Sequence, residues 1–117
     1  MTESEPCVFC RIIARDAPAD VVWEWGDAMA IVPLCPVVDG HTLIIPKVHV
    51  ADFAEDPAAS AATMYRASEL ACRLTSGASN IITSRGKEAT QSVFHLHLHL
   101  VPRAAGDHLA LPWPRGR

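Results

Sequence analysis

The sequence of 117 residues lacks several features that would place a protein in a broad class at once. No apolar run reaches the 18 or more residues of a membrane-spanning helix, and residues 1–7 have neither the positive charge nor the apolar stretch of a signal peptide. Positive charge is not in excess either, since 10 Lys and Arg stand against 13 Asp and Glu. We therefore expect a cytoplasmic protein with no membrane partner and no nucleic-acid partner.

Internal repeats and low-complexity segments are absent as well. Half of the residues are hydrophobic, which excludes disordered and fibrous proteins. The length leaves room for one ordinary core, so we expect residues 1–117 to form a single domain.

The chain contains signals for short strands and two helices. A helical apolar spacing covers residues 8–14, and a longer one begins at the N-cap Asp56 and ends at Gly77. Five β-rich segments are predicted as strands: residues 21–25, 28–32, 41–46, 80–83 and 93–101. The third is a continuous apolar run, which is typical of a central strand. Short links between many strands and one long helix predict an α+β fold with an antiparallel sheet.

The long helix has apolar residues at helical spacing, and we expect them to face the core. These are Met64, Ala67, Leu70, Ala71 and Leu74.

Three of the six histidines fall within five residues, at His95, His97 and His99. On a strand their side chains share one face, and the leucines between them share the other. Three imidazoles on one face cost desolvation and add no packing, whereas imidazole binds metals and moves protons near neutral pH. The segment therefore predicts a chemical site.

Two chemistries fit such a row of histidines. Three imidazoles can hold a catalytic zinc with water in the fourth position. Alternatively, one imidazole attacks phosphorus while a neighbour orients it or protonates the leaving group. Residues 84–92 favour the second, because their small side chains, hydroxyls and backbone N–H groups can surround a phosphate.

We expect the four cysteines to be thiols or metal ligands rather than disulfides, because we expect a reducing compartment. Cys7 and Cys10 have the spacing of a zinc half-site, and His49 with one of the three clustered histidines would complete it. Cys35 and Cys72 have no partner at ligand spacing. We expect both to be plain small apolar residues, with Cys72 facing the core.

On these residues the chain resembles the histidine triad (HIT) family of nucleotide hydrolases and transferases. The resemblance runs from residues 7–13 through 40–49 to 91–103, where His-x-His-x-His is followed by two apolar residues. It implies a five-stranded antiparallel sheet with one long helix and a short N-terminal helix. It also implies a homodimer with a joint ten-stranded sheet, and a cleft for a purine nucleotide.

The resemblance assigns roles to matching positions. His97 would be the nucleophile that becomes nucleotidylated, supported by His99 and His41. The implied ligands of a structural Zn²⁺ are Cys7, Cys10, His49 and His95. The implied nucleotide contacts are Leu34, Ser84, Thr90, Gln91 and Ser92.

The sequence departs from the family at three positions. Pro33 stands where many relatives have the Asp that contacts ribose, Ser84 replaces an Asn of the phosphate loop, and Thr90 replaces a frequent Gly.

The resulting hypothesis is an enzyme that cleaves P–N or P–O–P bonds through a covalent nucleotidyl-histidine. Its substrate would be a phosphoramidate, an adenylyl adduct or a dinucleoside polyphosphate. One alternative is a nucleotide-binding regulatory module with little turnover. Another is a zinc hydrolase with its metal on His95, His97 and His99.

Overall fold

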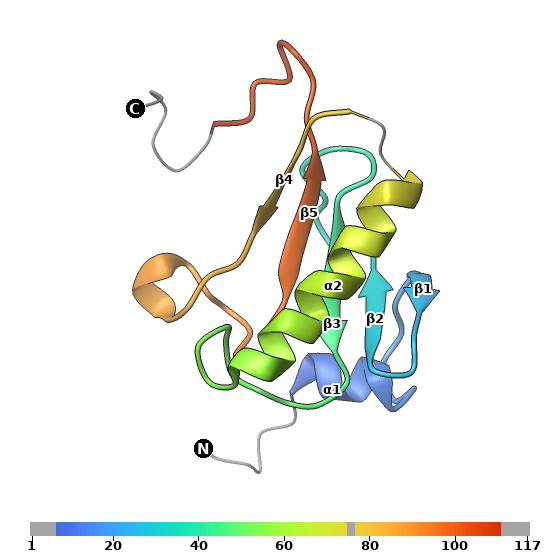
Figure 1. Ribbon diagram of the computed structural model, residues 1–117, viewed down its shortest axis with the longest axis vertical. Helices are drawn as coiled ribbons and strands as arrows, with labels where there is room; N and C mark the ends of the chain where they lie inside the picture. The colour runs from blue at the N-terminus through green and yellow to red at the C-terminus, as the bar shows by residue number, and fades with distance from the viewer. Residues whose placement is uncertain (1–6, 75–76, 111–117) are drawn as a thin grey trace.

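The computed structural model describes residues 7–74 and 77–110, which form an α+β fold around one five-stranded antiparallel sheet (Figure 1). The strands are β1 (Val21–Glu24), β2 (Ala28–Ile31), β3 (Thr42–Pro46), β4 (Ser79–Ile82) and β5 (Leu98–Pro102). The helices are α1 (Val8–Ile13), α2 (Pro57–Leu74) and the 3-10 turn η1 (Lys87–Ala89). The strand order is β1-β2-β3-β5-β4, so β3 lies in the centre as predicted. The predicted fold class is confirmed.

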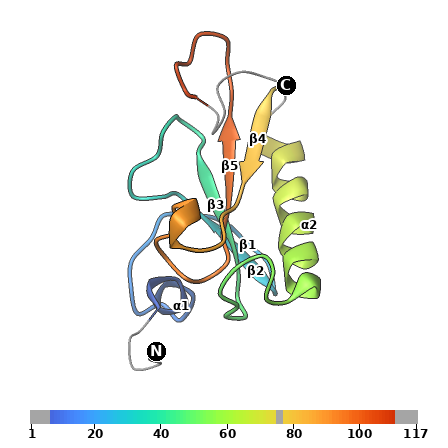
Figure 2. The ribbon, with the colours of Figure 1, turned by 90° about the vertical axis from the view of Figure 1, so that its left-hand side faces the viewer.

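The sheet is covered on both faces. Helix α2 packs on one face, whereas α1, η1 and the loop from β2 to β3 lie on the opposite side (Figure 2). Successive residues of β3 therefore enter different cores: Ile44 joins the cluster that includes Leu70 of α2, while Leu43 and Ile45 join Phe9 of α1. All five residues of β3 are buried for this reason. In the described ranges, no helix is long and apolar enough to cross a membrane.

Helix α2 begins as predicted, because the Asp56 carboxylate accepts the backbone N–H of Ala58 at 3.0 Å. Its buried face differs from the predicted one and consists of Thr63, Ala67 and Leu70. Thr63 can be buried since its hydroxyl donates to the Ala59 carbonyl at 2.7 Å. The prediction is wrong for two apolar residues of this helix: Met64 is 43% exposed and Leu74 52%. Met64 lies one residue, and hence about 100°, away from the packed row, and Leu74 is the last residue of the helix.

The environment predicted for Cys72 is also wrong. Its side chain is exposed, because it follows the half-buried Ala71 and points off the packed face. Cys35 is exposed as well, in the loop between β2 and β3.

The strand predicted over residues 93–101 begins only at Leu98. The residues before it bind the end of β3 and the loop that follows it, without forming a strand ladder: the His95 ring contacts the carbonyl of Pro46, the last residue of β3, and the Leu96 N–H donates to the Val50 carbonyl at 2.8 Å. Only His99 of the three histidines therefore lies in β5. Their side chains still lie on one side of the sheet, since Phe9 of α1 packs against His95 and His97, and His97 packs against His99. The alternating leucines are buried together, as expected: Leu96, Leu98 and Leu100.

Candidate active site and metal centre

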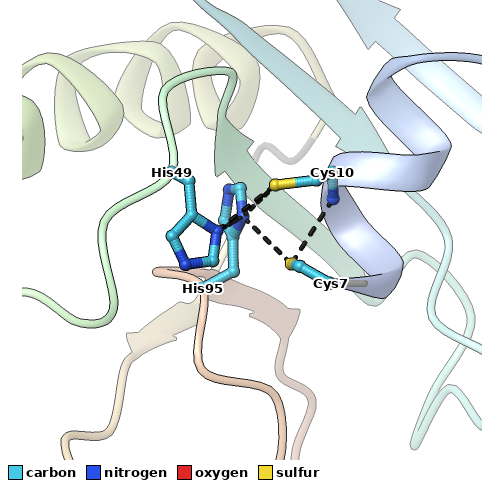
Figure 3. Close-up of side chains that lie close together, drawn as sticks. All are labelled: Cys7, Cys10, His49 and His95. Atoms are coloured by element: carbon cyan, nitrogen blue, oxygen red, sulfur yellow. Dashed lines mark hydrogen bonds between the residues drawn. The ribbon is translucent and has the colours of Figure 1, made fainter. Parts of the chain in front are cut away.

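Four metal-binding side chains from three parts of the chain meet at one point (Figure 3). They are Cys7 and Cys10 of the α1 region, His49 after β3, and His95 before β5, and their ligand atoms all lie within 4.8 Å of one another. The Nδ1 atoms of His49 and His95 are 3.1 Å apart, and the Cys10 Sγ lies 3.3 Å from the His49 Nδ1. The structure thus brings together all four residues that the resemblance implied as ligands.

The cluster fits a tetrahedral metal ion. A Zn²⁺ about 2.3 Å from sulfur and about 2.0 Å from nitrogen holds its ligand atoms roughly 3.3–3.8 Å apart, close to the spacing seen here. The His95 Nε2–H donates to the Pro46 carbonyl at 2.8 Å, so the unprotonated Nδ1 faces the two sulfurs. Burial lowers the pKa of His95 to about 4, which keeps its ring neutral and able to bind a metal.

The thiol of Cys10 points to the same conclusion. Burial, followed by the neighbouring Cys7, raises its pKa to about 11. A thiolate at this position therefore needs a cation to stabilise it, and a bound metal provides one.

The ring of His97 is held by a backbone carbonyl two residues earlier in the chain. Its Nδ1 lies 2.8 Å from the carbonyl oxygen of His95, so Nδ1–H is the donor and Nε2 carries the lone pair. The His97 side chain lines two hollows in the surface, and Nε2 is the nitrogen available to them. The geometry suits a nucleophile.

A second chain of hydrogen bonds fixes His41 and His99. The Val37 N–H donates to His41 Nδ1 at 3.0 Å, so the proton of the neutral ring sits on Nε2. That Nε2 lies 3.0 Å from the His99 Nδ1 and donates to it, which leaves the proton of His99 on its own Nε2. Burial lowers the pKa of both rings, that of His99 to about 4, where the charges of His97 and His41 act in the same direction. Neutral His99 thus presents an N–H donor close to His97.

The two hollows meet at His97 and His99. The larger, about 630 Å³, has mostly apolar walls from α1 and from the loop after β2, including Phe9, Ile12 and Leu34. The smaller, about 300 Å³, is bounded by the loop between β4 and β5 and by the chain after β5.

All five residues expected to contact nucleotide line one hollow or the other. Leu34 and Ser92 line the larger, as does Pro33, and the smaller is lined by Ser84, Thr90 and Gln91. Leu34 is fully exposed on the rim of the larger hollow.

Two of these residues shape the loop between β4 and β5. The buried Gln91 side chain donates to the Ala51 and Val93 carbonyls and accepts the Gly86 N–H at 2.8 Å, so its amide holds the loop to its surroundings. Thr90 is in the left-handed region with φ 72°, where a glycine would be unstrained. Its N–H donates within the loop to the Lys87 carbonyl at 2.9 Å, so this backbone group of residues 84–92 is already paired.

An arginine network beside the smaller hollow was not predicted from the sequence. Arg103 donates through Nε and Nη2 to the two carboxylate oxygens of Asp107, through Nη1 to the Asn80 side chain, and through Nη2 also to the Leu109 carbonyl. It therefore pins the chain after β5 against β4, next to His99. The i, i+4 spacing of Arg103 and Asp107 was the one signal in the sequence.

Phe9 is the other residue that the sequence did not single out. It appeared only as an apolar position of the first helix, and its place between Cys7 and Cys10 gave it no role of its own. In the structure it packs against two of the histidine rings.

A cluster of histidines at a cleft, next to a Cys₂His₂ cluster in an α+β fold, is typical of a histidine triad protein. The sequence comparison agrees, since the HIT domain model matches residues 14–106. The chain belongs to the HIT family.

Two relatives and one solved structure illustrate this similarity. An uncharacterized HIT-like protein of Mycobacterium tuberculosis is 39% identical over 111 residues, covering 91% of this chain and 77% of that protein. The adenosine 5'-monophosphoramidase of Saccharomyces cerevisiae is 34% identical over 110 residues, covering 92% and 70%. A zinc-bound histidine triad family protein of Mycobacterium smegmatis is 40% identical, with a TM-score of 0.79 over 92% of this chain and 81% of that one.

Proposed function

We propose that this protein hydrolyses nucleoside 5'-phosphoryl compounds at a P–N or P–O–P bond, with His97 as a covalent nucleophile. One observation carries the proposal. Separate hydrogen bonds fix the His97 lone pair and the His99 Nε2–H beside the point where the two hollows meet. A nucleophile and a donor to the leaving group are thus prepared before substrate binds.

The nucleotide binds across the two hollows in one orientation. The larger, mostly apolar hollow receives the nucleoside, the α-phosphate lies at the junction beside His97, and the leaving group enters the smaller hollow beside His99. Pro33 brings no carboxylate to the ribose, so the apolar walls supply more of the binding energy.

The reaction follows from these positions. The His97 Nε2 attacks phosphorus, a P–N bond forms, and the bond to the leaving group breaks while the His99 Nε2–H donates a hydrogen bond to the departing atom. An amine leaves with the proton that the phosphoramidate nitrogen already carries, and a phosphate leaves as its anion, so His99 keeps its own proton. Charge on the phosphoryl oxygens is stabilised by the Ser92 hydroxyl and nearby backbone N–H groups, and such donors are worth about 3 kcal/mol each. Water then attacks phosphorus, which releases the nucleoside monophosphate and restores His97.

The Cys₂His₂ cluster binds a structural Zn²⁺ in this proposal. The ligands are Cys7, Cys10, His49 and His95, a closed set with no position for substrate. Support comes from the ligand geometry and from the zinc-bound relative of Mycobacterium smegmatis. The ion cross-links the fold, since it connects α1 to the segment after β3 and to the segment before β5.

We also propose a homodimer in which the sheets join through β4 or the long helices pair. Strand β4 lies at one edge of the sheet, and the solvent face of α2 is weakly polar. The exposed residues of that face include Ala58, Ala61, Ala62, Tyr65 and Ser68. Sedimentation at micromolar concentration should give twice the chain mass, and a monomer mass would refute the pairing.

The function is tested by steady-state turnover of adenosine 5'-phosphoramidate, chosen because a relative is named for this class of substrate. His97→Ala should keep the fold and the affinity for AMP but lose nearly all turnover. If the wild type binds AMP tightly yet turns over none of a panel of phosphoramidates, adenylyl adducts and dinucleoside polyphosphates, the protein is a nucleotide-binding regulatory module instead.

A further inference from the structure

The nucleophile of the proposed reaction is held by more than its hydrogen bond. The bond from His97 Nδ1 to the His95 carbonyl sets one direction of the ring but does not prevent the ring from tilting about it. The Phe9 ring, 5.2 Å away between centroids at an interplanar angle of 76°, and the His99 ring, 5.2 Å away at 61°, restrict that tilt. His97 is thus in edge contact with two rings.

Phe9 makes the same kind of contact with the metal site. Its ring centroid lies 5.7 Å from that of His95, at an interplanar angle of 84°. Only 7% of Phe9 is exposed, so its ring has little freedom of its own. One buried side chain therefore touches both the nucleophile and a ligand of the metal centre.

The helix that carries Phe9 depends on that metal centre. Helix α1 has six residues and no acidic residue in its first turn, and helices this short are unstable by themselves. Its N-cap is Cys7, a member of the Cys₂His₂ cluster, whose sulfur accepts the Cys10 N–H at 3.4 Å. Figure 3 shows Cys7 and Cys10 at the start of α1. Because these two cysteines flank Phe9 in the sequence, an ion held by both sulfurs would fix the backbone at Phe9.

We propose that Phe9 is a positioning residue that couples the metal centre to the nucleophile: it holds the His97 ring in the orientation that presents Nε2 to the cleft. This inference rests on His97 being the nucleophile. It assigns the Cys₂His₂ cluster a consequence beyond stability, because loosening α1 releases the ring that limits the tilt of His97. Near-attack geometry is sensitive to such changes, and a displacement of about 1 Å can cost two orders of magnitude in rate.

The matched pair of variants is Phe9→Leu and Ile12→Val. Both residues lie on α1, are buried in the same cluster and line the larger hollow, but only Phe9 packs against the histidine rings. Both variants should retain one equivalent of zinc. We expect Phe9→Leu to lower kcat by about tenfold. Ile12→Val should change KM alone. Equal kcat values for Phe9→Leu and the wild type would overturn the proposal.

A spectroscopic readout does not depend on turnover. In zinc-loaded protein with ¹⁵N-labelled histidine, the wild type and Ile12→Val should show the His97 ring as a single Nδ1–H tautomer with a slowly exchanging proton. Phe9→Leu, and the wild type after chelation, should show averaged ring nitrogens and faster exchange of that proton. Unchanged His97 signals in Phe9→Leu would overturn the coupling. A wild type that shows the ordered ring but forms no covalent adduct would contradict the proposed function and not the ring contact.

Discussion

The Nε2 of His41 lies 3.0 Å from the Nδ1 of His99, although the two residues belong to different strand regions. Because the other nitrogen of His41 accepts the Val37 N–H, the proton between the two rings is assigned to His41. The loop before β3 therefore sets the tautomer of the histidine that faces the leaving group.

Replacing His41 should impair catalysis without removing the nucleophile. His41→Phe fills the same space but leaves the Nδ1 of the half-buried His99 without its donor, a loss of about 1 to 3 kcal/mol, or roughly 5- to 150-fold in kcat. His41→Asn can still donate to His99 and should recover part of the loss. The measurement is kcat for adenosine 5'-phosphoramidate, and a fully active His41→Phe would contradict the hydrogen-bond chain.

The buried histidines should make stability depend on pH between about 6.5 and 4. The pKa of His99 falls from 6.5 to about 4 in the folded protein, and burial lowers that of His41 as well. In this window the unfolded chain takes up protons that the folded chain does not, so the free energy of unfolding decreases as the pH falls and is constant above it.

Urea unfolding of zinc-saturated protein measures this dependence. His99→Asn should lose less stability than the wild type between about pH 6.5 and pH 4.5. The lowered pKa values of Glu24 and Asp107 also reduce stability as the pH falls through their ordinary values of 4.5 and 3.8, but both carboxylates are present in both proteins, so their effect cancels in the comparison. Parallel curves for the two proteins would show that His99 is not the cause.

Removing one thiol should abolish metal binding and lower stability. Cys10→Ser is expected to carry less than about half an equivalent of zinc, because the closed tetrahedral site loses one of its four ligands. An ion present at about 1,000 times its Kd stabilises a fold by about 4 kcal/mol, so the wild type should lose roughly 10–20 °C of Tm on chelation. Cys35→Ser, at an exposed cysteine outside the cluster, is the control and should match the wild type.

Replacing Thr90, the residue with positive φ in the loop between β4 and β5, should stabilise the fold. Thr90, at φ 72°, has a conformation that costs a β-branched residue about 1–2 kcal/mol. Thr90→Gly should therefore raise the free energy of unfolding by about 0.5–1 kcal/mol after the entropy of glycine is subtracted. Ser92→Gly, in the same loop without a positive φ, should lower it, and a gain in both variants would rule out the strain explanation.

Much of the architecture could be predicted from the sequence because the pattern was local. The apolar run in β3 indicated a central strand, and Asp56 with Pro57 marked the start of α2. The spacing of Cys7 and Cys10 similarly indicated half of a metal site.

The remainder depended on contacts between distant segments. The start of β5 was misplaced because the segment before it binds the loop after β3, and periodicity does not report a partner. The roles of Phe9 and Arg103 were missed for the same reason, since each depends on what the fold places beside it. The tautomer of each histidine depends on a single neighbouring group, such as the carbonyl of Pro46 for His95. It could not be predicted from the sequence.

The central claim is that His97 becomes covalently nucleotidylated, and an intact-mass measurement tests it most directly. Wild-type protein and His97→Ala are mixed briefly with excess adenosine 5'-phosphoramidate, quenched in denaturant at neutral pH and weighed by mass spectrometry. The wild type should gain the mass of one adenylyl group, located on His97 by peptide mapping, and His97→Ala should gain none. Turnover by a wild type that never carries the adduct, or an equal adduct on His97→Ala, would contradict the account.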